Sequence, residues 1–254
     1  MAKVIAVVNQ KGGVGKTTTS INLSAALGAA GKRVLLVDID PQGNATSGVG
    51  LDKRTVSVST YELLSGQAEP QNAVVHTDFK NLDLLPSNIN LAGAEIEMVD
   101  MSRRESRLKA VLAALRAQYD FILIDCPPSL GLLTLNGLCA ADGILVPVQW
   151  EYYALEGLSD LMSTLRMVKK RMNPRLEIFG VLLTMFDGLT NFSTQVAQEV
   201  RRHFPGKMFA SVIPRNIRLA EAPSHGLPVT AYDRSSRGAV AYREMASEII
   251  KKLR

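Results

Sequence analysis

The sequence predicts one α/β domain over residues 1–254, with a mainly parallel, twisted sheet and helices on both faces. Short runs of consecutive apolar residues recur along the chain, and such runs are typical of parallel strands buried on both faces. Stretches long enough for a helix separate these runs, without a linker, repeat or low-complexity tract. The 254 residues are 46% hydrophobic and 21% charged, which supplies the apolar surface that such a core needs.

Local patterns place each expected element in order. Strands are expected at the apolar runs 4–8, 33–38, 82–86, 121–125, 143–148, 179–184 and 210–214. Helices are expected at about 16–30, 59–65, 96–118, 130–139, 155–170, 192–204 and 237–253. In the long stretch 96–118, Leu108, Val111, Leu112 and Leu115 recur at helical spacing. The apolar stripe of the last helix is expected to dock on the sheet.

The first strand leads into a glycine-rich turn that opens the first helix. This order, with Gly15-Lys16-Thr17 at the start of the helix, is typical of a phosphate-binding loop and predicts a P-loop NTPase. Glycines let backbone N–H groups face phosphate oxygens, and the N-terminus of the helix adds donors and partial positive charge. Lys16 is expected to neutralise the β- and γ-phosphates, and Thr17 to ligate Mg²⁺ directly. The expected binding segment comprises Lys11, Gly12, Gly13, Val14, Gly15, Lys16, Thr17 and Thr18.

This loop departs from the usual pattern at its first position. The pattern G-x-x-x-x-G-K-[ST] requires glycine at position 10, where this chain has Gln10. The chain instead has a second lysine, Lys11, directly before the two glycines. Two lysines in one loop are more than a single triphosphate obviously needs.

Two aspartates follow strands at the edge where ligands bind in open α/β sheets. Asp40 lies on the loop after the strand 33–38, and Asp125 ends the strand 121–125 in the manner of a Walker B motif. Asp125 is expected to hold the Mg²⁺ shell through water, and Asp40 to act on the metal shell or on a water molecule. Asp40 could instead be an Asx-turn residue before Pro41.

Charge and cysteine content narrow the class of protein. The net charge is +5, and it is uneven, with −1 over residues 1–150 and +6 over residues 151–254. Such asymmetry suggests a polyanionic partner, although solvated helix faces would give the same count.

The two cysteines, Cys126 and Cys139, are too few for a disulfide framework or a C-x-x-C metal site and are expected to be buried. We expect a cytoplasmic protein without a membrane span or signal peptide.

Several separated motifs together resemble one family over essentially the whole chain. They are Lys11–Thr18, Asp38–Asn44, Ile124–Gly131, Glu151–Gly157, and Ile213–Asn216 with Glu221–Gly226. These segments resemble the deviant-Walker-A ATPases of the SIMIBI class of P-loop proteins, and within them the ParA/Soj chromosome-partitioning proteins. The resemblance implies an ATP-dependent homodimer that binds double-stranded DNA without sequence preference and is stimulated by a ParB/Spo0J-type centromere-binding protein. It also implies association with the nucleoid.

The resemblance also implies roles for single residues. Lys11 would reach the phosphates of the partner across the dimer, and Gly12 would lie at the dimer contact, where a side chain should clash. The catalytic residues would be Lys11, Lys16, Asp40 and Asp125. Among them, Asp40 would position the attacking water. The residues that would border the adenine are Pro214, Arg215 and Asn216.

The expected DNA contacts rest on charge and position only. Close relatives in the family carry a basic residue in the loop after the strand 179–184, whereas residues 185–190 of this chain contain none. The remaining candidates are Arg201, Arg202, Lys207, Arg218, Arg234, Arg237, Lys251 and Lys252.

Three other functions use related folds. A MinD-like membrane-associated ATPase would need an amphipathic membrane anchor at its C-terminus, and this C-terminus lacks a bulky aromatic face. An iron–sulfur reductase of the nitrogenase type would need a pair of cysteine ligands, and an ATP-dependent metabolic ligase would need a substrate pocket. The sequence favours the DNA-partitioning ATPase.

Overall fold

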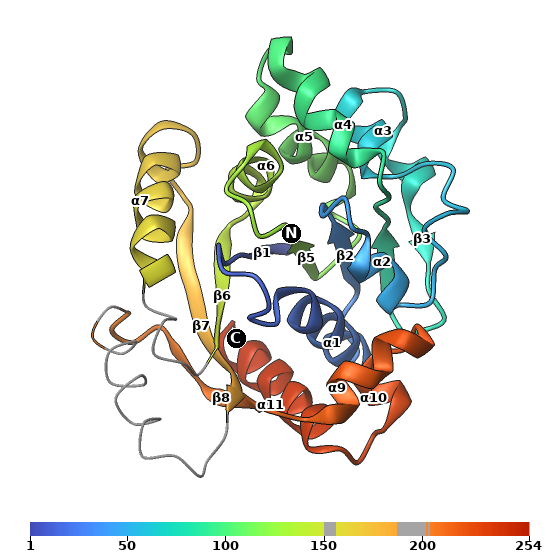
Figure 1. Cartoon of the computed structure of the whole chain (residues 1–254), viewed down its shortest axis with the longest axis vertical. Helices are drawn as coiled ribbons and strands as arrows, with labels where there is room; N and C mark the ends of the chain where they lie inside the picture. The colour runs from blue at the N-terminus through green and yellow to red at the C-terminus, as the bar shows by residue number, and fades with distance from the viewer. Residues whose placement is uncertain (150–155, 187–201, 203, 254) are drawn as a thin grey trace.

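A computed structural model describes residues 1–149, 156–186, 202 and 204–253 (Figure 1). Its centre is an eight-stranded sheet in the order β3-β4-β2-β5-β1-β6-β7-β8. Every neighbouring pair is parallel except β3 and β4, which are antiparallel. The strands are β1 Lys3–Val7, β2 Val34–Asp38, β3 Val75–His76, β4 Leu82–Leu85, β5 Phe121–Asp125, β6 Gly143–Gln149, β7 Glu177–Phe186 and β8 Met208–Pro214.

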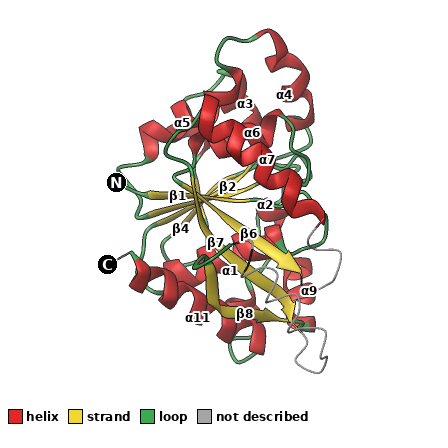
Figure 2. Cartoon of the chain, turned by 90° about the vertical axis from the view of Figure 1, so that its left-hand side faces the viewer, coloured by secondary structure: helices red, strands yellow, loops and turns green. Residues whose placement is uncertain are grey.

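Helices cover both faces of this sheet (Figure 2). They are α1 Lys16–Ala29, α2 Asn44–Gly48, α3 Thr60–Ser65, α4 Leu91–Glu97, α5 Arg107–Leu115, α6 Leu132–Ala140, α7 Glu156–Arg171, α9 Ile217–Glu221, α10 Val229–Tyr232 and α11 Arg237–Lys252. The turns Pro70–Ala73, Met98–Asp100, Arg104–Ser106 and Ala222–His225 are 3₁₀-helical. The predicted α/β fold, with a mainly parallel sheet between two helical layers, is confirmed.

The alternation of side chains along each strand divides the core into two halves. On β1, Val4 and Ala6 belong to the core under α3–α7, while Ile5 and Val7 belong to the core that contains residues of α1 and α11. All four side chains are buried, as the continuous apolar run predicts. Met245 and Ile249 of α11 are buried in the second core, so the expected docking of the last helix is confirmed.

The single helix expected over 96–118 is wrong. The chain forms α4, two 3₁₀ turns and α5 there, with Arg103 in the left-handed region at φ 54°. A side chain from α6 explains where α5 begins. The buried Asn136 accepts a hydrogen bond from the Leu108 N–H (3.1 Å) and donates one to the Arg104 carbonyl (2.8 Å). These bonds satisfy backbone groups at the start of α5 that a continuous helix would have paired internally.

Other differences concern short elements and undescribed segments. The sequence patterns did not predict α2, α9, α10 or β3, which span two to five residues each. The helix expected at 192–204 and the motif 151–157 lie largely outside the described residues. Cys126 and Cys139 are free and buried, as expected.

Candidate active site

Three neighbouring strands bring the predicted site residues to one edge of the sheet. In the register of the parallel ladder, Asp125 at the end of β5 lies between Val7 of β1 and Asp38 of β2. The loop after β1 leads into α1, and the loop after β2 carries Asp40. A hollow of about 350 Å³ opens at this edge, lined by Gly12, Gly13, Gly15, Lys16, Thr17, Thr18, Asp40, Gln42, Asn44, Pro128 and Met185. The phosphate loop and Asp40 therefore share one cavity.

The turn before α1 needs its glycines for their backbone angles. Gly13 and Gly15 have φ values of 73° and 87°, in the region that a side chain disfavours. Two contacts hold the loop: Thr184 of β7 donates to the Val14 carbonyl (2.8 Å), and the Lys16 ammonium donates to the Lys11 carbonyl (3.1 Å). Burial lowers the pKa of Lys16, while Asp125 opposes this shift. A bound phosphate would compensate the buried charge of this lysine.

Two buried carboxyl groups lie beside the loop. Asp38 and Asp125 have no exposed surface, and burial raises the pKa of both; the charge of Asp38 adds to the shift of Asp125. Ser20 donates to Oδ1 of Asp125 (2.8 Å), but Oδ2 of Asp125 is buried without a partner. An unpartnered buried oxygen beside Thr17 fits a hydrated Mg²⁺ ion, because a cation would favour the ionised carboxylate.

Asp40 holds a turn and also lines the phosphate-loop cavity. Its Oδ1 accepts a hydrogen bond from the Gln42 N–H (2.9 Å), which is the Asx turn. The side chain also lines the phosphate-loop cavity, and among the described residues no group donates to Oδ2. One carboxylate oxygen can therefore hold the turn while the other is available to a water molecule.

A second hollow of about 210 Å³ adjoins the first, with Gly15, Thr18 and Met185 common to both. It contains the predicted adenine-site residues Pro214, Arg215 and Asn216. Oδ1 of Asn216 is buried without a hydrogen-bond partner, so it could accept a bond from a nucleobase amino group. A nucleotide could lie across the two hollows, with its phosphates on the loop and its base near β8.

Met185 is a site residue that the sequence patterns did not reveal. It lines both hollows and has a φ of 54°, which is uncommon for a residue with a side chain. Its position at the end of β7 became informative only when the strand order placed β7 beside the phosphate loop.

Gly12 and Lys11 have distinct surroundings within one chain. A Cβ atom added at Gly12 would meet no atom within 4 Å, and its φ is not positive. Nothing inside the described part of the chain therefore requires glycine at this position. Lys11 is half-buried, and its N–H donates to the Asn9 side chain (3.0 Å).

Comparisons with known proteins show the family of the chain. A family model described as an AAA domain matches residues 2–178. The sporulation initiation inhibitor protein Soj of Bacillus subtilis is 57% identical over 249 residues, covering 98% of each chain. The chromosome partitioning protein ParA of Caulobacter vibrioides is 50% identical over 254 residues, covering 99% of this chain and 95% of that protein. The chain belongs to the Soj/ParA family of chromosome-partitioning ATPases.

Solved structures support the cofactors of this Soj/ParA family member. A structure of cobyrinic acid a,c-diamide synthase from Mycobacterium smegmatis contains an ATP analog and magnesium. It is 42% identical, has a TM-score of 0.88, and the match covers 100% of this chain and 96% of that chain. The chain is thus a P-loop ATPase that uses ATP and Mg²⁺. No helix in the described part of this Soj/ParA chain is both long and apolar enough to cross a membrane.

The basic residues proposed for DNA differ in their surroundings. Arg201 lies outside the described residues. Arg218 is ion-paired with Glu221 (2.8 Å) and Asp233 (3.4 Å), so a phosphate would compete with two carboxylates there. Lys252 donates to the Phe179 carbonyl (2.9 Å). Arg202, Arg234, Arg237 and Lys251 are exposed.

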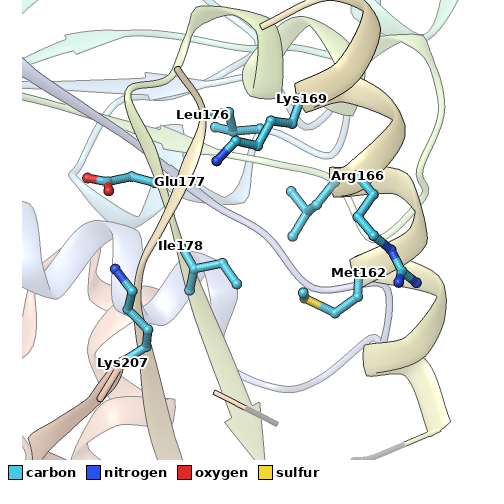
Figure 3. Close-up of a pocket in the computed structure, with 8 residues that line it drawn as sticks. Met162, Arg166, Lys169, Leu176, Glu177, Ile178 and Lys207 are labelled. Carbon is cyan, nitrogen blue, oxygen red and sulfur yellow. The ribbon is translucent and has the colours of Figure 1, made fainter. Parts of the chain in front are cut away.

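Lys207 lies at the opposite edge of the sheet from the phosphate loop. It borders a hollow of about 350 Å³ between α7 and the first residues of β7, with Arg166 and Lys169 on α7 (Figure 3). Of the eight residues that line it, four are apolar, including Leu176 and Ile178, and Glu177 is acidic. Arg166 and Lys169 are basic neighbours of Lys207 that the sequence did not single out.

Proposed function

We propose that this Soj/ParA chain is an ATP-dependent DNA-partitioning switch. Two chains would dimerise around two ATP molecules, bind double-stranded DNA without sequence preference at the nucleoid, and respond to a ParB/Spo0J-type partner. The observation that carries the proposal is the combination of a second loop lysine, Lys11, with an open Gly12. Gly12 is exposed and lines the phosphate cavity, Lys11 directly precedes it, and a second chain could contact both. The relative named chromosome partitioning protein ParA matches 99% of this chain.

Residues in and beside the phosphate cavity would each contribute a different part of the chemistry of ATP hydrolysis. The amides around Gly13 and Gly15 and the ammonium of Lys16 would bind the phosphates. Thr17 would hold Mg²⁺ directly and Asp125 through water, and the metal would neutralise charge on the phosphates. Asp40 would orient a water molecule with its second oxygen. Lys11 would add positive charge to the partner's site, which makes turnover depend on association.

The decisive test of this mechanism is Asp40→Ala. We expect MgATP hydrolysis to fall at least about 10-fold, because the water would lose its orienting group. We expect ATP binding to persist, so that an ATP-bound dimer accumulates in light scattering. Lys16→Ala should instead abolish ATP binding. Asp52→Ala is a matched control, because Asp52 is paired with the exposed Arg54 away from the cavity. Wild-type turnover by Asp40→Ala would contradict the proposed role.

DNA binding requires a separate measurement. A gel shift with ATP should retard duplexes of unrelated sequence at low salt, and the retardation should weaken steeply with salt as phosphate contacts are screened. No retardation at low salt would reject this part of the proposal.

A MinD-like membrane function has less support. Membrane docking by the last helix would need a free apolar face, whereas Met245 and Ile249 of α11 are buried in the core. Binding of the ATP-bound chain to liposomes in co-sedimentation would favour that alternative.

A further inference from the structure

A ring of buried hydrogen bonds surrounds the backbone of Asp40. The Asp40 N–H donates to Oδ1 of Asp38 (3.1 Å), and Oδ2 of Asp38 accepts from the Thr46 hydroxyl (2.8 Å). The Thr46 hydroxyl accepts from the Ser87 N–H (2.9 Å), and the Ser87 hydroxyl donates back to the Asp40 carbonyl (2.7 Å). Asp38, Thr46 and Ser87 have no exposed surface.

The ring joins three segments that are separate in sequence. Asp38 ends β2, Thr46 belongs to α2, and Ser87 follows β4, the strand that pairs with β2. Ser87 is also close to the turn itself, because a Cβ atom at Gly43 would lie 2.9 Å from the Ser87 carbonyl oxygen. The loop after β4 therefore supports the Asp40 turn from its buried side.

These bonds leave Asp40 little freedom. Its N–H is bonded to Asp38, its carbonyl to Ser87 and to the Gly43 N–H (2.9 Å), and its Oδ1 to the Gln42 N–H. Only Oδ2 is left without a bond from the described residues. Catalytic groups must be held close to their productive geometry, and a displacement of about 1 Å can cost about 100-fold in rate.

We propose that Ser87 is a positioning residue for ATP hydrolysis that holds the Asp40 turn so that one carboxylate oxygen faces the phosphate cavity. Its hydroxyl acts directly on the Asp40 carbonyl, and its N–H acts through Thr46 and Asp38. Ser87 itself lines neither hollow of the nucleotide site. Its effect therefore belongs to the hydrolytic step and not to ATP affinity. This inference rests on the proposed role of Asp40.

The test compares variants that remove or keep single hydroxyl groups in the full chain. We expect Ser87→Ala and Thr46→Val each to lower the single-turnover rate of MgATP hydrolysis about 10-fold, with ATP affinity changed less than about 2-fold. Thr46→Ser, which keeps the hydroxyl, should retain most of the rate. Ser24→Ala is the matched control, because the Ser24 hydroxyl is buried without a partner. Thermal unfolding of each variant checks that it is folded.

The double variant separates positioning from general loosening of the structure. In an Asp40→Ala background, Ser87→Ala should have no further effect on the rate, because both changes act through one group. A wild-type rate for Ser87→Ala, or a further fall in the double variant, would overturn the inference while leaving the role of Asp40 intact. A wild-type rate for Asp40→Ala alone would instead contradict the proposed function.

Discussion

At the residue scale, the site buries two carboxyl groups, Asp38 and Asp125, and only one of them has hydrogen bonds to both of its oxygens. Asp38 receives three hydrogen bonds, two from Thr46 and one from Asp40, whereas Oδ2 of Asp125 receives none. Burying such a group disfavours its charged form, which explains the raised pKa of Asp125. A bound cation would favour the ionised form of Asp125, so metal binding and the protonation of this residue should be coupled.

A pH prediction follows from Asp125. Its folded pKa is raised from 3.8 to about 8, so between these values the folded chain keeps a proton that the unfolded chain has released. The stability of the nucleotide-free protein should therefore fall as pH rises through this range. Asp125→Asn should flatten that dependence, as measured by thermal unfolding in EDTA from pH 5 to pH 8. Equal slopes for the wild type and the variant would contradict the assignment.

At the element scale, α11 protects the edge of the sheet. β8 is the last strand of the sheet that the described residues form, so the N–H groups on its outer side have no neighbouring strand there. Glu248 of α11 accepts hydrogen bonds from the Ala210 N–H (2.8 Å) and the Ser211 N–H (2.9 Å). It also accepts one from the Ser211 hydroxyl (2.7 Å). Bonds from backbone amides and the Ser211 hydroxyl hold the pKa of Glu248 below its usual value despite partial burial.

Removing this carboxylate should destabilise the fold. Glu248→Ala should lower the melting temperature at pH 7 by about 2–6 °C, because charged hydrogen bonds to two backbone amides are lost. A carboxyl group whose pKa is lowered in the folded chain stabilises that chain at pH values above its unfolded pKa of 4.5. The difference in melting temperature between the wild type and Glu248→Ala should therefore shrink as the pH falls below 4.5. Glu244→Ala, an exposed change on the same helix, serves as the control. Equal melting temperatures for the two variants would contradict this role of Glu248.

At the scale of the whole molecule, the two edges of the sheet differ in character. The phosphate loop, Asp40 and the base hollow share the carboxyl edge, while Lys207 lies at the other edge with Arg166 and Lys169. Arg237 and Lys251 lie near opposite ends of α11, which at 1.5 Å per residue puts them about 21 Å apart. A DNA surface that used both groups would extend along nearly the whole length of α11.

Gly12 is the residue at which a substitution tests the proposed ATP-dependent dimer most directly. Gly12→Val should fold and bind ATP normally, since a Cβ atom there meets nothing within 4 Å in the chain. It should remain monomeric with ATP in light scattering, because the side chain would enter the space of the second chain. Gly93→Ala is a control, because its Cβ would make only an ordinary contact with Glu97 at 3.8 Å. An ATP-dependent Gly12→Val dimer would place the interface elsewhere.

Local sequence was enough for the fold class and for much of the site. The buried strands and the phosphate loop depend on consecutive residues, so their patterns can be recognised in a single sequence. The same reasoning located Asp40 and Asp125 at strand ends. It failed over 96–118, where Leu108 to Leu115 do form a helix but Asn136, distant in sequence, helps to set where it begins.

The sequence by itself therefore determined the α/β class, the nucleotide loop and its unusual Lys11, because each of these features depends on residues that are adjacent in the chain. Only the tertiary structure decided what surrounds them. The unpartnered oxygen of Asp125, the place of Met185 between two hollows and the ring through Ser87 all depend on how separate segments pack together. Such contacts join residues far apart in the chain, and no local pattern records which of them will meet.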